Sequence, residues 1–435
     1  MITEGWDGKC FCTAFMCANR ITEKLAADGK SCCSCEACLQ ACPTGAVSMA
    51  EDALGFRVCR IDAAKCVDCG ICSGVCPMNA VSRLSRDVPE CAAAAVHLDA
   101  EVLRESSSGG AFTALVQLFC GPDGLAAGAV MDENFDVRHE LVRGADNIAP
   151  FRKSKYLPSS SNSCFLKVRK ALSEGERVLF SGTPCQVAAL RLFLRGRDFE
   201  NLLTVDFSCH GPGSPKIFKQ YAGELGREEK SRLVEFSFRH KTRRFRHYSS
   251  HSSWARFENG KERVSFHDPW FGGFVRGLFK MDACHQCPYV GLERVSDVTV
   301  ADFWGVEHVS ADLEGGRGVS LVLANTAKGK RLAERLPELM RVENFPLDSC
   351  VPYNGPLRER LGRNPMREKF LEAVKSGTVK SALEGLNPRG GVSAHAEELV
   401  FDLFPARLRQ AWREKWWGLK GALKSKMLSL FGRKR

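Results

Sequence analysis

Long apolar runs are missing from this sequence of 435 residues. No stretch approaches the roughly 18 consecutive apolar residues that a membrane-spanning helix requires. The first thirty residues also lack the apolar segment of a secretory signal, because charged side chains such as Asp7, Arg20 and Lys24 interrupt them. We therefore expect a cytoplasmic protein that does not span a membrane.

Cysteine is too sparse for a disulfide-stapled scaffold, although the chain has 21 cysteines. Such scaffolds carry cysteine at roughly 8–10% of their residues. An unexported chain with this many cysteines is expected to use them as metal ligands or reactive thiols. A composition of 44% hydrophobic and 26% charged residues excludes wholesale disorder and suits a chain of several folded domains.

The net charge of +11 is unevenly spread along the chain. Residues 407–435 contain ten basic residues and one acidic residue, so they carry +9 and leave only +2 for the rest. A nucleic-acid-binding protein usually distributes its basic side chains over a folded face. We therefore expect no nucleic-acid partner.

Two cysteine runs near the start share the spacing C-x2-C-x2-C-x3-C, and each is followed by proline. This spacing is the ligand pattern of bacterial two-cluster ferredoxins, in which the fourth cysteine of each run binds the other cluster. The pattern predicts two 4Fe–4S clusters. The expected ligands are Cys32, Cys35, Cys38 and Cys76 for the first cluster and Cys66, Cys69, Cys72 and Cys42 for the second.

The residues that follow the two runs, 43–49 and 77–84, are also alike, and we expect each to form a turn and a short strand. A pair of zinc sites is the alternative, but zinc takes four ligands and commonly two spaced pairs, which fits the duplicated spacing less well. Four neighbouring cysteines fit no further copy of the pattern, and we interpret them as buried or incidental thiols: Cys10, Cys12, Cys17 and Cys33.

A strand–helix–strand unit is expected in the main body of the chain. Residues 177–181 and 202–207 have the pattern of buried strands, and a helical segment lies between them. This order predicts a parallel pair with a right-handed crossover. Cys185 and Cys209 then follow the carboxyl ends of neighbouring strands, where open α/β sheets bind ligands.

A C-x2-C pair, Cys284 and Cys287, follows further along the chain. Alone it is a weak signal shared by zinc ribbons and redox dithiols. Together with Cys185 and Cys209 it provides four ligands, enough for a third cubane cluster. Residues 297–304 are expected to form the next strand, and 320–325 a final strand that closes the sheet.

Ser106–Gly110 precedes an apolar helical segment. Hydroxyls and glycines at a helix start leave backbone N–H groups available for a phosphate or pyrophosphate, but a plain N-cap with a flexible entry explains the same residues equally well.

The most basic stretch of the main body is 239–247. It separates two expected strands, 234–238 and 253–257, and residues 258–261 are expected to form a hairpin turn. A solvated charge run is one interpretation. The other is a positively charged lip that attracts an anionic substrate or an acidic electron-donor protein.

Several long segments resemble the beta subunits of coenzyme F420 hydrogenases and dehydrogenases. They are SSSGGAFTAL (106–115), FRKSKYLPS (151–159), VLFSGTPCQVAALR (178–191), LLTVDFSCHGPGSPKIF (202–218), DACHQCPYVGLERVSDVTVADFWG (282–305) and GVSLVLANTAKGK (318–330). The resemblance covers roughly residues 30 to 345, with a ferredoxin module in front as in many bacterial members. It implies an α+β or α/β fold in which a ferredoxin-like dicluster domain precedes a mixed α/β domain that binds a flavin and a cluster.

The resemblance also implies site residues. The expected FAD contacts are Ser107, Ser108, Gly109, Gly110, Lys155, Tyr156, Gly182, Thr183, Pro184 and Gln186. The expected ligands of a flavin-side cluster are Cys185, Cys209, Cys284 and Cys287. His210, beside Cys209, is a candidate proton donor or a residue that tunes the cluster, although a surface or packing histidine fits equally well.

An oxidoreductase follows from this resemblance. Electrons would pass between the ferredoxin-type clusters, a third cluster, FAD and a soluble organic molecule, either a deazaflavin such as coenzyme F420 or a small substrate, as in a glycan or envelope pathway. The expected protein partner is a ferredoxin or another electron-transfer protein. The alternative is a non-catalytic electron-transfer subunit that docks on a partner enzyme.

The expected domains are a ferredoxin-type domain (26–87), a beta-subunit N-terminal-like region (88–175) and a C-terminal-like FAD and cluster domain (176–345), with an N-terminal extension (1–25), a helical region (346–405) and a basic tail (406–435). In the tail, Trp412, Trp416 and Leu419 begin an apolar stripe at helical spacing. A basic helix of this kind suits the surface of an anionic membrane, and equally a docking face of its own protein or a partner.

Overall fold

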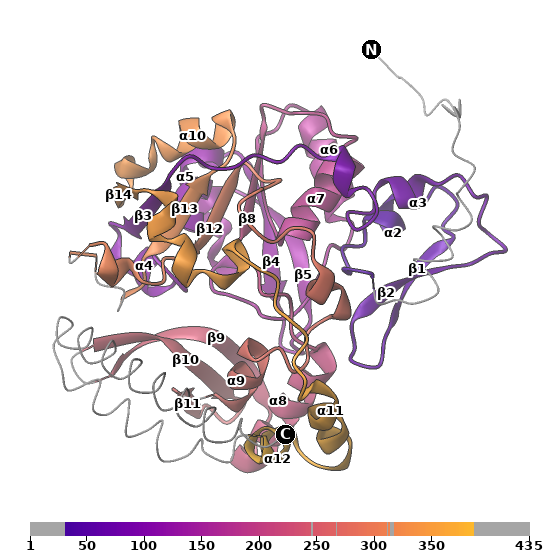
Figure 1. Ribbon diagram of the computed structural model, residues 1–435, viewed down its shortest axis with the longest axis vertical. Helices are drawn as coiled ribbons and strands as arrows, with labels where there is room; N and C mark the ends of the chain where they lie inside the picture. Colours follow the sequence, from indigo (N-terminus) through magenta and orange to yellow (C-terminus); the bar gives the residue numbers. More distant parts are fainter. Residues whose placement is uncertain (1–30, 245–246, 267, 311, 314–316, 387–435) are drawn as a thin grey trace, which may run out of the picture.

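The computed structural model describes residues 31–386 apart from 245–246, 267, 311 and 314–316, and gives no side-chain description for 243–251. A nine-stranded mixed sheet forms its centre (Figure 1). In order of pairing, its strands are β14 (Met340–Phe345), β3 (Ala92–His97), β13 (Ser320–Ala324), β12 (Val298–Asp302), β8 (Leu202–Phe207), β7 (Val178–Ser181), β4 (Leu125–Met131), β5 (Val137–Arg143) and β6 (Ser159–Ser160).

The middle of this sheet has the parallel arrangement that the strand–helix–strand pattern predicts. The β12–β8, β8–β7 and β7–β4 pairs are parallel, so their carboxyl ends lie at one edge. On the other side of β12 the pairs are antiparallel. The expectation that residues 320–325 close the sheet is wrong, because β3 and β14 both lie beyond β13.

Helices cover both faces of the large sheet. On one face α5 (Ala111–Cys120) and α10 (Ala327–Ala333) contribute to a core with alternate residues of β4, β7 and β8. The opposite face packs against α6 (Cys164–Ser173) and α7 (Pro184–Phe193). Short α4 (Ala100–Arg104) packs on β3. Because the middle strands are buried on both faces, they are mostly apolar rather than alternating, although β8 also buries Thr204 and Asp206.

A second, three-stranded antiparallel sheet lies below the first in Figure 1. Its strands are β9 (Leu233–Arg244), β10 (His247–Phe257) and β11 (Glu262–Ser265), and it packs with α8 (Pro215–Glu229), α9 (Pro269–Val275), α11 (Arg367–Ser376) and α12 (Val379–Gly385). Its core is aromatic, with Phe218, Phe238 and Trp270 in mutual contact. The basic stretch 239–247 is therefore not a loop between two strands, because residues 239–244 form the end of β9.

The N-terminal part of the described chain forms a small unit at the right of Figure 1. It consists of α2 (Ala37–Ala41), the hairpin β1 (Val47–Glu51) and β2 (Arg57–Ile61), α3 (Ile71–Gly74) and the 3-10 helix η1 (Val81–Arg83). A strand follows the first cysteine run, as expected, but the expected strand after the second run is wrong, because this segment forms η1.

This N-terminal unit is fixed to the large sheet by a buried carboxylate. Glu36 forms an ion pair with Arg57 at 3.0 Å and accepts hydrogen bonds from Ser160 Oγ at 2.8 Å and the Asn162 amide at 3.2 Å. The Gln40 side chain donates to Ser161 Oγ at 2.6 Å. Glu36 and Gln40 thus both bind the segment that includes and follows β6, and these contacts hold the cysteine runs against the main body.

Among the described residues, no helix has the length and apolar character to cross a bilayer. The basic tail and the N-terminal extension lie outside the described residues, as do Cys10, Cys12 and Cys17.

Candidate iron–sulfur sites

Four cysteines from both runs line one pocket of the N-terminal unit. They are Cys42, Cys66, Cys69 and Cys72. Asp68 and Gly70 have positive φ angles, which wrap the short loop between the last three thiols. Burial opposes ionisation of Cys42, but hydrogen bonds from Thr44 and nearby backbone amides outweigh it and lower the pKa of this thiol. The pocket thus provides four sulfur ligands, and backbone amides donate hydrogen bonds to one of them, Cys42.

The remaining four cysteines of the two runs form a second group. Cys38 interacts electrostatically with Cys32 and Cys35, and so does Cys76. Burial raises the pKa of Cys32 to about 11 and that of Cys76 to about 12. Buried thiols of this kind ionise when a metal centre supplies the positive charge. The structure therefore groups Cys76 with the first run and Cys42 with the second.

A third group of cysteines lies at the carboxyl edge of the parallel strands. Cys185 is in the first turn of α7, and Cys209 follows β8. Cys284 lies in the 3-10 helix η4 (Asp282–Gln286), and Cys287 comes directly after this helix. Cys284 interacts electrostatically with Cys209, Cys185 and Cys287, and burial raises its pKa well above the ordinary value. All four thiols come together although they originate from three separate segments.

Gly211 permits the approach of two of these segments. Its φ of +80° is left-handed, and a Cβ at this position would lie 2.7 Å from the Cys284 sulfur. Its amide donates to the Cys209 sulfur at 3.3 Å. Only glycine combines this backbone with this contact, so the loop after β8 can present both a thiol and an amide to one centre.

A buried cation lies beside the third group. Lys280 has no exposed surface, and its Nζ donates to the carbonyl of His210 and lies over the Phe274 ring at 4.2 Å. Burial lowers its pKa to about 8, while the neighbouring Cys209 and Cys284 act in the opposite direction. A positive charge at this position stabilises the thiolates and any negatively charged cluster that they hold.

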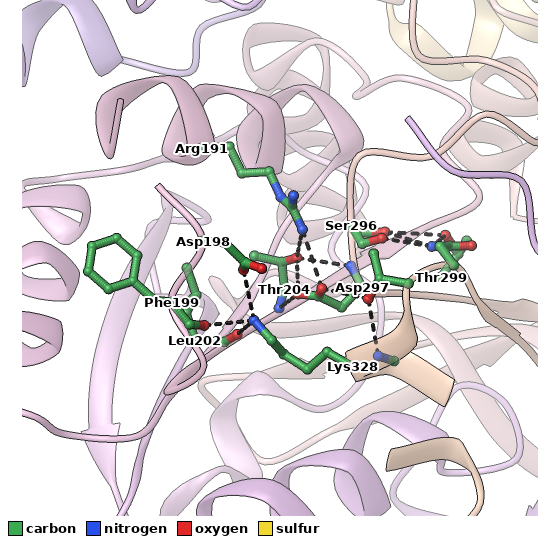
Figure 2. A network of polar contacts seen from close by, with 12 residues as sticks. Arg191, Asp198, Phe199, Leu202, Thr204, Ser296, Asp297, Thr299 and Lys328 are labelled. Atoms are coloured by element: carbon green, nitrogen blue, oxygen red, sulfur yellow. Dashed lines mark hydrogen bonds and ion pairs between the residues drawn. The ribbon is translucent and has the colours of Figure 1, made fainter. Parts of the chain in front are cut away.

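Two buried networks of ion pairs and hydrogen bonds fix the elements that carry these cysteines. Arg294 pairs with Asp206 of β8 at 2.9 Å, with both side chains almost fully buried, and donates to the Phe207 carbonyl at 3.3 Å. In the network of Figure 2, Asp297 accepts from Thr204 of β8 and from Arg191 of α7. The helix after Cys185, the strand before Cys209 and the segment after Cys287 are therefore tied together.

Single-metal chemistry fits these groups poorly. Within the described ranges, no three Cys, His, Asp or Glu side chains are arranged to hold one metal ion. A mononuclear zinc site needs four donors about one metal–sulfur bond from a common point. Thiols that come together more loosely suit a cubane, whose four irons lie between the sulfurs. The residues present therefore fit 4Fe–4S clusters better than zinc.

Two further cysteines, Cys33 and Cys59, lie between these groups. Cys33 interacts with both Cys35 of the first run and Cys185 of the third group, and these interactions and its burial raise the pKa of its thiol. Cys59 of β2 accepts from Cys38 and also interacts with Cys72. The interpretation of Cys33 as a buried or incidental thiol does not include these interactions. No spacing rule identifies either residue, because their neighbours come from other segments.

The expected flavin residues lie along one connected path. Ser154 donates to Ser107 Oγ through its amide at 2.8 Å, and Gln186 donates to the Ser159 carbonyl at 3.0 Å. The segment 152–161 thus links the Ser106–Gly110 loop to the Gly182–Gln186 turn. Thr183 and Gln186 form a reciprocal capping box at the start of α7, with Pro184 in its first turn, so these side chains also have a local structural role.

The Ser–Gly loop packs closely on the large sheet. Ser108 Oγ donates to the Val319 carbonyl at 2.9 Å, and a Cβ on Gly109 would lie 2.1 Å from the Ala95 carbonyl oxygen. Gly110 is the N-cap of α5 and has no side chain to cap it, and the Ala111 amide donates to Ser320 Oγ at 3.4 Å. The hydroxyl of Ser108 is therefore used internally, whereas the helix start keeps the donor character that suits a phosphate.

Two basic residues of β9 lie beside this helix start. Arg239 is buried, pairs with Asp302 at 2.9 Å and reaches Tyr156 Oη at 3.4 Å. Lys241 Nζ donates to the Ser108 carbonyl at 2.6 Å, and burial lowers its pKa to about 8. The start of the basic stretch is thus built into the junction of the two sheets rather than solvated.

Lys155 and His210 occupy different settings. Lys155 Nζ donates to the Pro150 and Arg152 carbonyls at 2.7 Å, and burial, followed by the charge of Lys153, lowers its pKa to about 7. His210, beside Cys209, keeps some exposed surface, yet burial of its ring and the charge of Lys280 lower its pKa to about 4. The structure places His210 next to the third cysteine group, and its chemical role stays a prediction.

Comparisons with known proteins match two parts of the chain. Residues 31–80 match the model of a 4Fe-4S dicluster domain, and residues 175–349 match that of the C terminus of the coenzyme F420 hydrogenase/dehydrogenase beta subunit. No curated protein matches the chain significantly. Among solved structures, a chain of the F420-reducing NiFe hydrogenase complex from Methanosarcina barkeri is similar, with 18% identity, a TM-score of 0.42, and coverage of 68% of this chain and 94% of that chain.

Proposed function

Because residues 175–349 belong to the coenzyme F420 hydrogenase/dehydrogenase beta-subunit family and residues 31–80 to a 4Fe-4S dicluster domain, we propose that this protein is an iron–sulfur flavoprotein oxidoreductase. It passes electrons between a protein carrier and a soluble organic molecule, a deazaflavin such as coenzyme F420 or a small-molecule substrate. We place this reaction in the cytoplasm.

The observation that carries the proposal is the continuity of the cysteine groups. Cys59 interacts with Cys38 of the second group and electrostatically with Cys72 of the pocket. Cys33 lies between Cys35 of the second group and Cys185. Electron transfer between centres requires short distances, and these interactions place each group next to the following one. The proposed order is the Cys42 site, then the Cys32 site, then the Cys185 site.

The third cysteine group is proposed to hold a third 4Fe–4S cluster. Its four thiols, the amide of Gly211 and the buried charge of Lys280 provide ligands, a hydrogen bond and charge compensation for such a cluster. Hydrogen bonds and nearby charge set the potential of a cluster. The loop after β8 would thus both hold this centre and tune it.

The flavin is proposed to bind at the junction of the two sheets. Its phosphates fit the start of α5, where the N-cap Gly110 has no side chain and Arg239 and Lys241 supply positive charge. Tyr156 provides an aromatic wall beside Arg239. Bound FAD supplies the conversion between single electrons and a hydride. Burial and the nearby charge of Lys280 lower the pKa of His210 to about 4, so its ring is neutral near pH 7, and we propose that it tunes the cluster beside Cys209 rather than donating a proton.

Anaerobic purification followed by iron, sulfide and flavin analysis tests this proposal. Three clusters predict about twelve irons per chain, with one FAD. Cys284→Ser should remove about four irons and leave the two ferredoxin-type clusters. Lys241→Met should lower flavin content without loss of iron. About eight irons in the unchanged protein would exclude the third cluster, and zinc without sulfide would exclude iron–sulfur chemistry altogether.

A subunit that transfers electrons to a separate catalytic partner is the second candidate, because residues 175–349 match a family named for a subunit. Reduction of coenzyme F420 or of a small substrate by the isolated protein separates the two candidates. An isolated protein with all three clusters and FAD that reduces only proteins would favour the electron-transfer subunit.

A further inference from the structure

A groove lined by three arginines lies between the N-terminal unit and the main body. Arg83 of η1, Arg169 of α6 and Arg195, just after α7, line it. Helix α2 contacts both α6 and α7 at this junction, and α2 and α3 lie beside these helices in Figure 1. Because elements from both parts contribute, no single sequence segment shows that the groove exists.

The groove adjoins a proposed cluster site. Cys42, Pro43 and Ile71 line both the groove and the pocket of Cys42, Cys66, Cys69 and Cys72. Cys69 of that pocket is exposed, so this centre lies close to the surface. A carrier seated in the groove would therefore meet the chain at the outer end of the proposed electron path.

The charge of the groove is of one sign. No acidic residue lines it. The Arg169 guanidinium lies 5.0 Å from the centroid of the Phe193 ring, which holds it at the groove wall. Neither Arg83 nor Arg169 has a carboxylate partner among the described residues. Arginines beside an apolar floor provide both the electrostatic steering and the contact area that a transient protein complex uses.

Charge argues against several other possible occupants of the groove. A second copy of the chain would place arginines against arginines if it bound through the same groove. Residues 387–435 contain eleven basic and four acidic residues, and residues 1–30 contain four of each. Neither segment supplies the negative charge that complements the groove. The complementary partner is an acidic protein.

We propose that this arginine groove is the docking site of an acidic one-electron carrier protein, which exchanges electrons with the centre held by Cys42, Cys66, Cys69 and Cys72. The proposal rests on the proposed function, since it names the partner at the outer end of the same path. One electron moves per encounter, from the reduced carrier to the oxidised cluster or in the reverse direction.

Stopped-flow reduction of the full, cluster-containing chain by a reduced acidic bacterial ferredoxin tests this docking site. Electrostatic steering changes association rates by roughly 10–1,000-fold and weakens as salt rises. We expect Arg83→Glu/Arg169→Glu to lower the second-order rate about ten-fold or more at low salt, with little difference from the unchanged protein at high salt. Binding of a redox-inert, gallium-substituted ferredoxin should weaken in parallel.

The matched control is Arg227→Glu/Lys369→Glu, which changes the net charge equally at two residues of α8 and α11, away from the groove. Equal rates for the two double variants would overturn the docking site. Unchanged iron content and unchanged reduction by a small viologen show that the groove variant is intact. Failure of viologen to reduce any cluster, in every variant, would instead contradict the proposed function.

Discussion

Cys33, in the loop before α2, and Cys185, at the start of α7, pack against the same core, and each thiol shifts the pKa of the other. The two residues belong to regions that match different family models, so this contact links the dicluster domain directly to the beta-subunit region. Cys33 belongs to no ligand pattern, but this contact places its thiol on the proposed electron path.

Replacement of Cys33 tests this role. Cys33→Ala should keep all the iron but lower the reduction potential of the flavin-side cluster by tens of millivolts, because it removes a neighbouring thiol that can donate to the Cys185 sulfur, and such donation favours the reduced state. Cys33→Ser retains a donor and should restore part of the shift. Redox titration followed by EPR measures both. Loss of about four irons in Cys33→Ala would show instead that Cys33 is a ligand.

Gly211 should be intolerant of any side chain. Gly211→Ala places a methyl group 2.7 Å from the Cys284 sulfur and forces a left-handed φ on alanine. We expect loss of about four irons while the clusters of the N-terminal unit remain. Gly223→Ala, where a Cβ meets no atom within 4 Å, is the control. A full iron count in Gly211→Ala would contradict the assigned geometry of the third site.

Lys280 is expected to raise the potential of the flavin-side cluster. Its buried charge lies beside Cys209 and Cys284, and reduction adds negative charge there. Lys280→Met should therefore lower that potential, and Lys280→Arg should largely retain it. The same EPR-monitored titration reads out both variants. An unchanged potential in Lys280→Met would show that the charge of Lys280 is screened or that its amine is neutral.

Stability should fall in mild acid because of His139. The imidazole ring of His139 is buried and hydrogen-bonds Ser159 Oγ at 2.7 Å and the Ser181 carbonyl at 2.9 Å. Burial lowers the pKa of this ring to about 4. An unfolded histidine titrates near 6.5, so between about pH 6.5 and pH 4 the unfolded state binds more protons and folding weakens as pH falls.

The expected loss between pH 7.5 and 5.5 is about 1 kcal/mol of unfolding free energy from this group. Anaerobic urea unfolding at the two pH values measures it. His139→Gln should be less stable at neutral pH but should lose less on acidification. An acid-induced loss as large in His139→Gln as in the unchanged protein would assign the pH dependence to other groups.

The basic tail gives a prediction from sequence alone. Truncation after Pro405 removes the +9 segment with its tryptophans. If the tail binds an anionic membrane peripherally, sedimentation with phosphatidylserine-containing vesicles should disappear while iron and flavin contents persist. Vesicle binding that survives truncation would favour the alternative, in which the tail docks on its own protein or a partner.

Local patterns were sufficient for much of the architecture. The parallel strands around α7 follow from apolar runs whose length and flanks are encoded in contiguous residues. Other elements needed the tertiary structure. Ala92–Ala95 has strong helical propensity, yet it forms β3, because β13 and β14 supply backbone partners on both sides. The segment 77–84 lacks such a partner and forms η1 instead of a strand.

By itself the sequence determined the ferredoxin-type cysteine spacing, the family resemblance and the division of charge between body and tail, because each is a property of residues close together in the chain. Only the tertiary structure decided that Cys33 meets Cys185, that the basic stretch begins inside the sheet junction, and that Arg83 and Arg169 share a groove beside Cys42. The physical reason is that these contacts join segments far apart in the chain, which only packing such as that of α2 against α6 and α7 brings together.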